Sequence, residues 1–107
     1  MVNSDETNTL IIQKNIGSPS RVAINDVSKE VEKLEANGAG LDELFPLING
    51  QRASNVYFKG DIDGGIWSCG QSVGLIKNVP SVHELIQLIV KEAQESLGFI
   101  KERIDSN

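Results

Sequence analysis

The residues from Gly60 to Pro80 bring together the side chains of this sequence that are best suited to chemistry. The stretch GDIDGGIWSCGQSVGLIKNVP holds half of the 10 glycines, the only tryptophan and the only cysteine. Glycine-rich segments bind phosphates, flavins or metal ions in some proteins, and in others they let two backbones pack closely. The spacing within the stretch distinguishes these alternatives.

The spacing argues against a metal-binding loop. Asp61 and Asp63 have the separation of the first two ligands of a calcium loop. The sharp turn of such a loop then requires glycine where Ile66 stands, and a bidentate glutamate where Ser72 stands. We therefore expect no metal site, and we expect Asp61 or Asp63 to cap a helix that follows.

Phosphate-loop and nucleophile motifs are also absent from the stretch. Its glycines match neither the P-loop spacing nor the G-x-G-x-x-G spacing of dinucleotide-binding turns. Ser68 cannot belong to a nucleophile elbow, because Ile66 stands where that motif needs glycine. Cys69 and His83 are the only residues of their kinds, and their separation makes no case for thiol catalysis. We expect a buried thiol and a surface imidazole.

The sequence GGIWSCGQSVGLI, residues 64–76, is then interpreted as a glycine-notched helix. In a helix, Gly70 and Gly74 would lie one above the other on the same face. Each glycine costs about 1 kcal/mol of helix propensity relative to alanine. That cost is tolerable where a Cβ would collide with a neighbour, which is either another helix backbone or a flat ring system.

The elements around this stretch are predicted to be mainly helical. The β-branched run TLIIQKNI, residues 9–16, predicts one strand, and no second strand is evident. Helices are predicted over 25–38 with Asn25 or Asp26 as the N-cap, over 41–50 with a break or bend at Pro46, and over 52–60. The inward positions are expected to be Val27, Val31 and Leu34 in the first helix, and Ala53, Val56 and Tyr57 in the third.

The closing segment PSVHELIQLIVKEAQESLGFIKERI carries the clearest helical pattern. Ser81 and Glu84 form a capping box after Pro80. Gly98 marks an expected end or kink. Apolar residues recur at alternating steps of three and four and widen in the first half, where burial on two sides is expected. The stripe consists of Val82, Leu85, Ile89, Ala93, Leu97, Ile100 and Ile104, widened by Ile86, Leu88 and Val90.

Composition limits the classes of function. A chain of 107 residues with 39% hydrophobic and 23% charged residues suits one globular domain. A net charge of −5 opposes binding to nucleic acid or to an anionic membrane surface. The polar start MVNSDETN is no signal peptide, and no window is apolar enough for a membrane span. The expected location is cytoplasmic.

Several short motifs stand in a definite order between about Thr9 and Leu97. They are Arg21, Val22 and Asn25; Gly60 and Asp61; Gly70 and Gln71; and Gly74, Leu75 and Ile76, followed by a proline turn and the closing helix. No single motif is specific, whereas their order and spacing together are. Together they resemble the C-terminal part of the nitronate monooxygenase (2-nitropropane dioxygenase) family, which is related to FMN-dependent enoyl-acyl-carrier-protein reductases.

The family resemblance implies an FMN-binding (β/α)₈ TIM barrel with a helical domain inserted late in the chain. A barrel of this type needs about 250 residues, so the chain is expected to be a fragment without the barrel. The expected fold is mainly α with one short N-terminal strand. Its parts would be a connecting strand segment (1–20), a helical subdomain (21–60), and the glycine-notched helix with a barrel-covering C-terminal helix as one structural unit (61–107).

The resemblance also carries expectations for the site. The family's catalytic histidine and most FMN-phosphate contacts lie upstream, so no catalytic residue is expected here, and His83 does not inherit that role. Ser68, Gly70 and Gln71 match a flavin-proximal motif, in which the serine hydroxyl contacts flavin or substrate and glycine lets the backbone approach the ring. The alternative is that Ser68 has a structural hydroxyl and that Gly70 and Gly74 are packing residues.

The leading functional hypothesis is a fragment of a flavoenzyme that oxidises alkyl nitronates with O₂ using FMN. The isolated chain is expected neither to bind FMN nor to be active. One alternative is a fragment of an FMN-dependent enoyl-acyl-carrier-protein reductase, which needs a nicotinamide donor. Another is a stand-alone, non-catalytic helical interaction module that self-associates through the closing helix.

Overall fold

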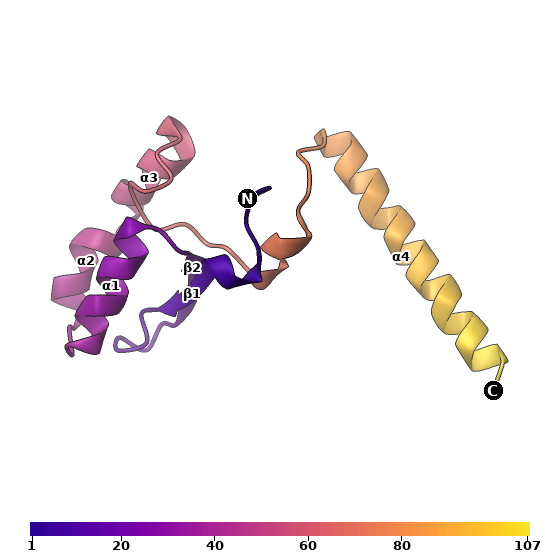
Figure 1. The fold of residues 1–107 in the computed structure, drawn as a ribbon, viewed down its shortest axis with the longest axis horizontal. Coiled ribbons are helices and arrows are strands. Elements are labelled where there is room, and N and C mark those ends of the chain that lie inside the picture. The colour runs from indigo at the N-terminus through magenta and orange to yellow at the C-terminus, as the bar shows by residue number, and fades with distance from the viewer. The chain divides into compact units, whose positions relative to one another are not determined.

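The computed structural model describes residues 1–107, which form two units, Met1–Lys77 and Asn78–Asn107 (Figure 1). The elements in chain order are η1 (Glu6–Asn8), β1 (Thr9–Ile12), β2 (Ser20–Ala23), α1 (Asp26–Ala36), α2 (Leu41–Ile48), α3 (Gly50–Lys59), η2 (Gln71–Leu75) and α4 (Val82–Asp105). The mainly helical character is as predicted. The three-part division at residues 20 and 60 stays a prediction.

The prediction of a single strand is wrong, because β1 and β2 form an antiparallel hairpin. Thr9 pairs with Ala23 and Ile12 pairs with Ser20 at the two ends of the ladder. β2 is four residues long and lies between a proline turn and a helix cap, so it carries little local strand signal. Its pairing comes from β1 on one edge and from the backbone around Ser68 on the other.

β1 ends earlier than the expected residue 16 because the chain turns at Gln13. Gln13 has a left-handed backbone, with φ of 64°. The buried carboxylate of Glu35, at the end of α1, accepts hydrogen bonds from the backbone N–H groups of Gln13 and Asn15 at 2.8 and 3.0 Å. The N–H groups of Gln13 and Asn15 thereby have hydrogen-bond acceptors, which a neighbouring strand would have supplied if β1 had continued. Glu35 therefore anchors the hairpin loop to α1.

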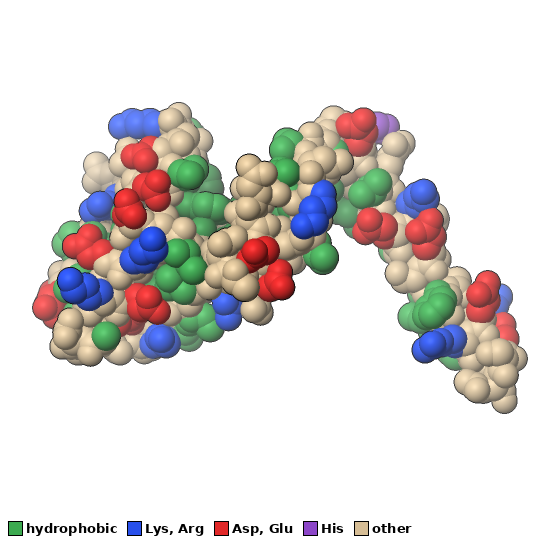
Figure 2. Space-filling model, in the orientation of Figure 1, with side chains coloured by type: hydrophobic (Ala, Val, Ile, Leu, Met, Phe, Trp, Pro, Cys, Tyr) green, Lys and Arg blue, Asp and Glu red, His purple; other side chains and the backbone are tan.

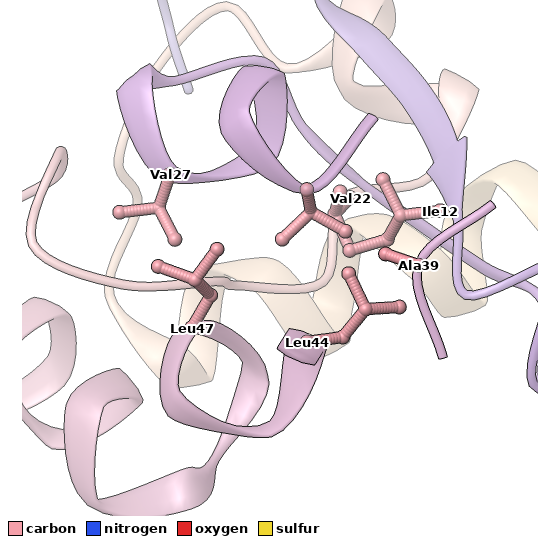
Figure 3. Close-up of a cluster of buried hydrophobic side chains, with 7 residues drawn as sticks. Ile12, Val22, Val27, Ala39, Leu44 and Leu47 are labelled. Atoms are coloured by element: carbon pink, nitrogen blue, oxygen red, sulfur yellow. The ribbon is translucent and has the colours of Figure 1, made fainter. Parts of the chain in front are cut away.

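The core of the first unit lies between the hairpin, α1 and α2 (Figure 3). Asn25 caps α1, and Val27 and Val31 are buried with Leu34 partly buried beside them, as the spacing predicted. The side chains drawn in Figure 3 come from all of these elements and point toward one another. The buried cluster consists of Ile12, Val22, Val27, Val31, Ala39, Leu44 and Leu47.

Pro46 lies inside α2 without breaking it, so of the expected break or bend the break is wrong. Leu44 and Leu47, on either side of the proline, are both buried in the core and hold the helix through this position. The helix ends at Ile48, and Asn49 then caps α3, so Gly50 begins a helix where it was expected to end one. Tyr57 of α3 was predicted to point inward and is exposed.

The predicted helix over 64–76 is also wrong. Residues 61–65 form a turn, the chain is extended near Ser68, and only Gln71–Leu75 form a short 3₁₀ helix. Asp61 and Asp63 consequently cap no helix. Gly70 and Gly74 do not stack on a helical face, because an α-helix is missing there.

α4 begins at the predicted capping box and runs through Gly98 to Asp105, so Gly98 does not end the helix. Within its own unit, Asn78–Asn107, all of its side chains are exposed, including every member of the apolar stripe. Figure 2 shows hydrophobic side chains beside charged ones along this helix. No helix in the structure combines the length and the apolar character needed to cross a membrane.

The capping box of α4 makes its first turn sensitive to acid. The Ser81 hydroxyl and N–H donate to the Glu84 carboxylate at 2.7 and 2.8 Å and hold the pKa of Glu84 below its usual 4.5. A lowered pKa means that the stabilisation is present above pH 4.5 and is lost as the pH falls through the folded-state value. We expect the protection factor of the Leu85 amide, which donates to Ser81 O, to fall in this range.

The matched variant for this prediction is Glu84→Gln, which keeps a hydrogen-bonding cap without a titrating group. Its Leu85 protection factor should not change between pH 7 and pH 3. An equal fall in the variant and the native chain would contradict the role of the Glu84 carboxylate.

Candidate functional site

The turn of residues 61–65 is held by side chains from three parts of the chain. Asn25 Nδ2 donates to Ile62 O and to Gly65 O, each at 2.8 Å. Arg52 Nε donates to Gly64 O at 3.1 Å. Trp67 Nε1 donates to Ile62 O at 3.1 Å. Backbone carbonyls without sheet or helix partners are thereby satisfied, and the turn has a defined position.

Asn25 links this turn to the start of α1. Its Oδ1 accepts from the Ser28 N–H at 2.8 Å as the helix cap, while its Nδ2 makes the two bonds to the turn. The residue is only 5% exposed. The sequence predicted Asn25 or Asp26 as the cap and included Asn25 in the family pattern; the structure shows that Asn25 is the cap and adds its contact with the glycine-rich segment.

Beyond the turn, the chain runs beside β2. Ala23 N donates to Trp67 O at 3.1 Å, Cys69 N donates to Arg21 O at 3.3 Å, and Ser68 pairs with Val22. Successive side chains of extended backbone point to opposite faces. Cys69 is accordingly buried against Ala23 and Val73, as expected for a structural thiol, whereas Ser68 is directed outward and is exposed.

Ser68, Gly70 and Gln71 therefore form a short exposed edge on a fixed backbone. The Ser68 hydroxyl and the Gln71 amide make no hydrogen bond within the chain, and both side chains are exposed. A Cβ at Gly70 would meet only Ser72 Oγ, at 3.6 Å. Free polar groups beside a bare backbone position leave this edge open to a ligand. Their role in binding stays a prediction.

The other glycines of the stretch pack closely within the chain. A Cβ at Gly65 would lie 2.7 Å from Arg52 O and 3.0 Å from Ala53 Cα. A Cβ at Gly74 would lie 3.2 Å from Glu6 N. Backbone packing thus accounts for Gly65 and Gly74, but not for Gly70.

The segment beside Gly74 contains a carboxylate with a lowered pKa. The Thr7 hydroxyl and N–H donate to the Asp5 carboxylate and lower the pKa of Asp5.

The remaining titratable side chains assemble no further centre. No group of three or more His, Cys, Asp or Glu side chains is placed to hold a metal ion. His83 is exposed in the first turn of α4. Neither residue of the Asp61 and Asp63 pair makes a side-chain hydrogen bond, and both are exposed.

The structure reveals one feature that the sequence analysis missed, a polar cleft between α3 and the 61–65 turn. It has a volume of about 710 Å³, and its lining includes Arg52, Asn55, Lys59 and Asp61. The signal was present in the sequence, because Arg52, Asn55 and Lys59 have the i, i+3, i+7 spacing of one helical face. The apolar positions of the segment, which include Ala53 and Val56, orient the helix by its other face and do not reveal this polar one.

Comparison with known proteins shows a likeness of fold. No family model matches the chain. The structure is similar to that of FabK from Thermotoga maritima, with a TM-score of 0.73 and 21% identity over 94% of this chain and 31% of that one. It is also similar to the M276A mutant of the same FabK, with a TM-score of 0.67 and 21% identity over 94% of this chain and 28% of that one. The chain therefore has the fold of a part of FabK and spans less than a third of its length.

Proposed function

We propose that this chain is the C-terminal part of an FMN-dependent oxidoreductase of the nitronate monooxygenase type, whose TIM barrel is formed by other residues. The observation that carries the proposal is the FabK likeness, which includes 94% of this chain but only 31% of that protein. FabK proteins are FMN-dependent, and this likeness favours an FMN-dependent oxidoreductase family. The shared motif order described above supports the same assignment.

The exposed apolar face of α4 supports the presence of a second body. Large exposed apolar surfaces are uncommon on proteins that act alone. The face runs along the helix from Val82 to Ile104, and its positions recur at seven residues (Val82 and Ile89, Ala93 and Ile100) as well as at eleven (Val82 and Ala93, Ile89 and Ile100). The face therefore suits the surface of a barrel, and a second copy of the helix stays the alternative.

In the complete enzyme, bound FMN would supply the redox chemistry. The part of this chain would be to hold the edge of Ser68, Gly70 and Gln71 against the flavin and substrate. Asn25 and Arg52 fix the turn that precedes this edge. The Ser68 hydroxyl is free to donate to a nitronate oxygen or to a flavin acceptor. Proton abstraction and the phosphate contacts would belong to residues outside this chain.

An enoyl-acyl-carrier-protein reductase is the competing function, because the fold likeness is to FabK. The two activities differ in substrate and in electron donor. A reductase needs a nicotinamide and an enoyl thioester, whereas a nitronate monooxygenase needs O₂ and an alkyl nitronate. The exposed edge described above suits both.

A chimera tests the proposal directly. The matching part of Thermotoga FabK is replaced by this chain, and the purified chimera is measured for bound flavin, for O₂ consumption with propyl nitronate and for enoyl-thioester reduction with a nicotinamide. We expect stoichiometric FMN and flavin-dependent turnover of one of the two substrates. Because the proton-transfer residues of the chimera come from the FabK barrel, the substrate that is used reports on that barrel and not on this chain. A folded chimera without flavin, beside flavin-bearing parent FabK, would overturn both.

A further inference from the structure

The polar cleft between α3 and the 61–65 turn takes no part in the proposal above. It is open to solvent, has a volume of about 710 Å³, and is lined by polar residues and glycine alone. Such a lining does not suit an acyl chain or another apolar ligand, which binds in pockets with mainly hydrophobic walls. The cleft instead suits a hydrated, charged ligand.

The charges in the cleft favour an anion. Arg52 and Lys59 are cationic and Asp61 is anionic, so the lining carries two positive charges and one negative, in a chain of net charge −5. The only ion pair in the structure is that of Lys91 with Glu95 on α4. Neither cation in the cleft is therefore paired with a carboxylate, and both are available to a ligand.

Arg52 is held in position before any ligand arrives. Its Nε donates to Gly64 O at 3.1 Å, and its own carbonyl packs against Gly65. The 61–65 turn that contacts Arg52 is itself held by two hydrogen bonds from Asn25. The terminal amino groups of the guanidinium make no hydrogen bond within the chain. A side chain that is already ordered loses less entropy on binding.

The spacing along α3 indicates the size of the anion. Arg52, Asn55 and Lys59 lie on one helical face, and the first and last are about 10 Å apart along the axis. Long side chains rooted at that separation can converge on a group wider than one phosphate, with the Asn55 amide between them. Guanidinium and ammonium groups are the usual partners of phosphates. Asp61, which accepts hydrogen bonds, would face the neighbouring part of the ligand.

We propose that this cleft binds the diphosphate group of a nucleotide, with Arg52, Asn55 and Lys59 on the phosphates and Asp61 on a ribose hydroxyl. A carboxylate that accepts from ribose hydroxyls is a common element of nucleotide sites. The inference rests on the cleft alone and does not depend on the proposed flavoenzyme function. It concerns a surface separate from the edge of Ser68, Gly70 and Gln71.

The test uses the full chain, with ADP and inorganic pyrophosphate as probes, followed by ligand-observed NMR at low salt. Lys59→Gln should weaken both probes about tenfold, because one charge-assisted hydrogen bond is lost. Lys29→Gln changes an exposed lysine on α1 that does not line the cleft, and should leave both affinities unchanged. Equal weakening by the two variants would overturn the site in favour of unspecific charge attraction.

Asp61→Ala tests the ribose contact separately from the phosphate contacts. Removal of the negative charge should tighten pyrophosphate, whereas loss of the ribose acceptor should abolish any preference for ADP over pyrophosphate. The Lys59 and Asp61 side chains make no hydrogen bond or ion pair in the structure, and unchanged Trp67 fluorescence would verify the fold of these variants. No detectable ADP binding at about 5 mM, or an unchanged preference in Asp61→Ala, would overturn the proposal.

Discussion

Asn25→Asp should destabilise the first unit by about 3 kcal/mol at neutral pH, although aspartate caps helices as well as asparagine does. The variant keeps the acceptor for the Ser28 N–H but replaces the amide that donates to Ile62 O and Gly65 O. Gly65 O would lose its only hydrogen-bond donor, and a carboxylate oxygen would face two carbonyl oxygens at a buried position. Ile62 O would keep the Trp67 indole.

Urea unfolding of the full chain, followed by the fluorescence of Trp67, measures this effect on the unit that contains the turn. Asn49→Asp is the matched control. Asn49 also caps a helix, and its amide also donates to two carbonyls, those of Phe45 and Pro46, but these bonds are exposed and local. Its loss should stay below about 1 kcal/mol. Equal losses in the two variants would show that Asn25 acts as a cap alone.

Gly65→Ala should cost about 1–3 kcal/mol, because the new methyl group would meet backbone that cannot move aside easily. It would lie 2.7 Å from Arg52 O, 2.9 Å from Arg52 C and 3.0 Å from Ala53 Cα. Relief would require the 61–65 turn to separate from α3. That movement would also lengthen the hydrogen bond from Arg52 Nε to Gly64 O.

Gly70→Ala provides the comparison within the same segment. Its new methyl group would have Ser72 Oγ as its only neighbour, at 3.6 Å, which is ordinary contact. The stability of this variant should match that of the native chain or exceed it slightly, because alanine has fewer unfolded conformations than glycine. A large loss at Gly70 together with none at Gly65 would contradict the packing described here. Both variants are measured by the same Trp67 unfolding curve.

The elements that the sequence predicted well are those with local signals. The cap at Asn25 with apolar residues at Val27 and Val31 predicted α1, and the Ser81 and Glu84 box predicted the start of α4. In both helices, residues within one or two turns of each other supply the caps and the periodic face.

The elements that the sequence did not predict depend on distant partners. β2 pairs with β1 and with the backbone at Ser68, so four residues of modest propensity become a strand. The segment around Ser68 has enough apolar residues for a helix, but β2 binds its backbone in an extended form, and Asn25 and Arg52 bind the turn that precedes it. Helix propensity is a weak signal beside such contacts, particularly where glycine has already lowered it.

The candidate edge also has one part that local sequence predicts and another that depends on distant partners. Ser68, Gly70 and Gln71 adjoin one another in the sequence, so the motif alone was enough to group them. The outward direction of Ser68 follows from its alternation with buried Cys69, which is a consequence of pairing with β2. Gln71 is exposed at the start of the short helix η2 that follows. The cleft beside α3 requires the 61–65 turn to fold back against the helix, and no local pattern predicts that return.

The two edges of β2 form their hydrogen bonds at different stages of folding. Its pairing with β1 closes a short loop, whereas its pairing with Ser68 must wait until the three helices between them have been made. Short loops close at lower entropic cost, so the hairpin is available first as a template. The edge that carries Ser68 and Gly70 is then the last backbone to join the sheet. A ribosome that releases this chain gradually would expose the hairpin's open side for the interval in which α1, α2 and α3 are synthesised.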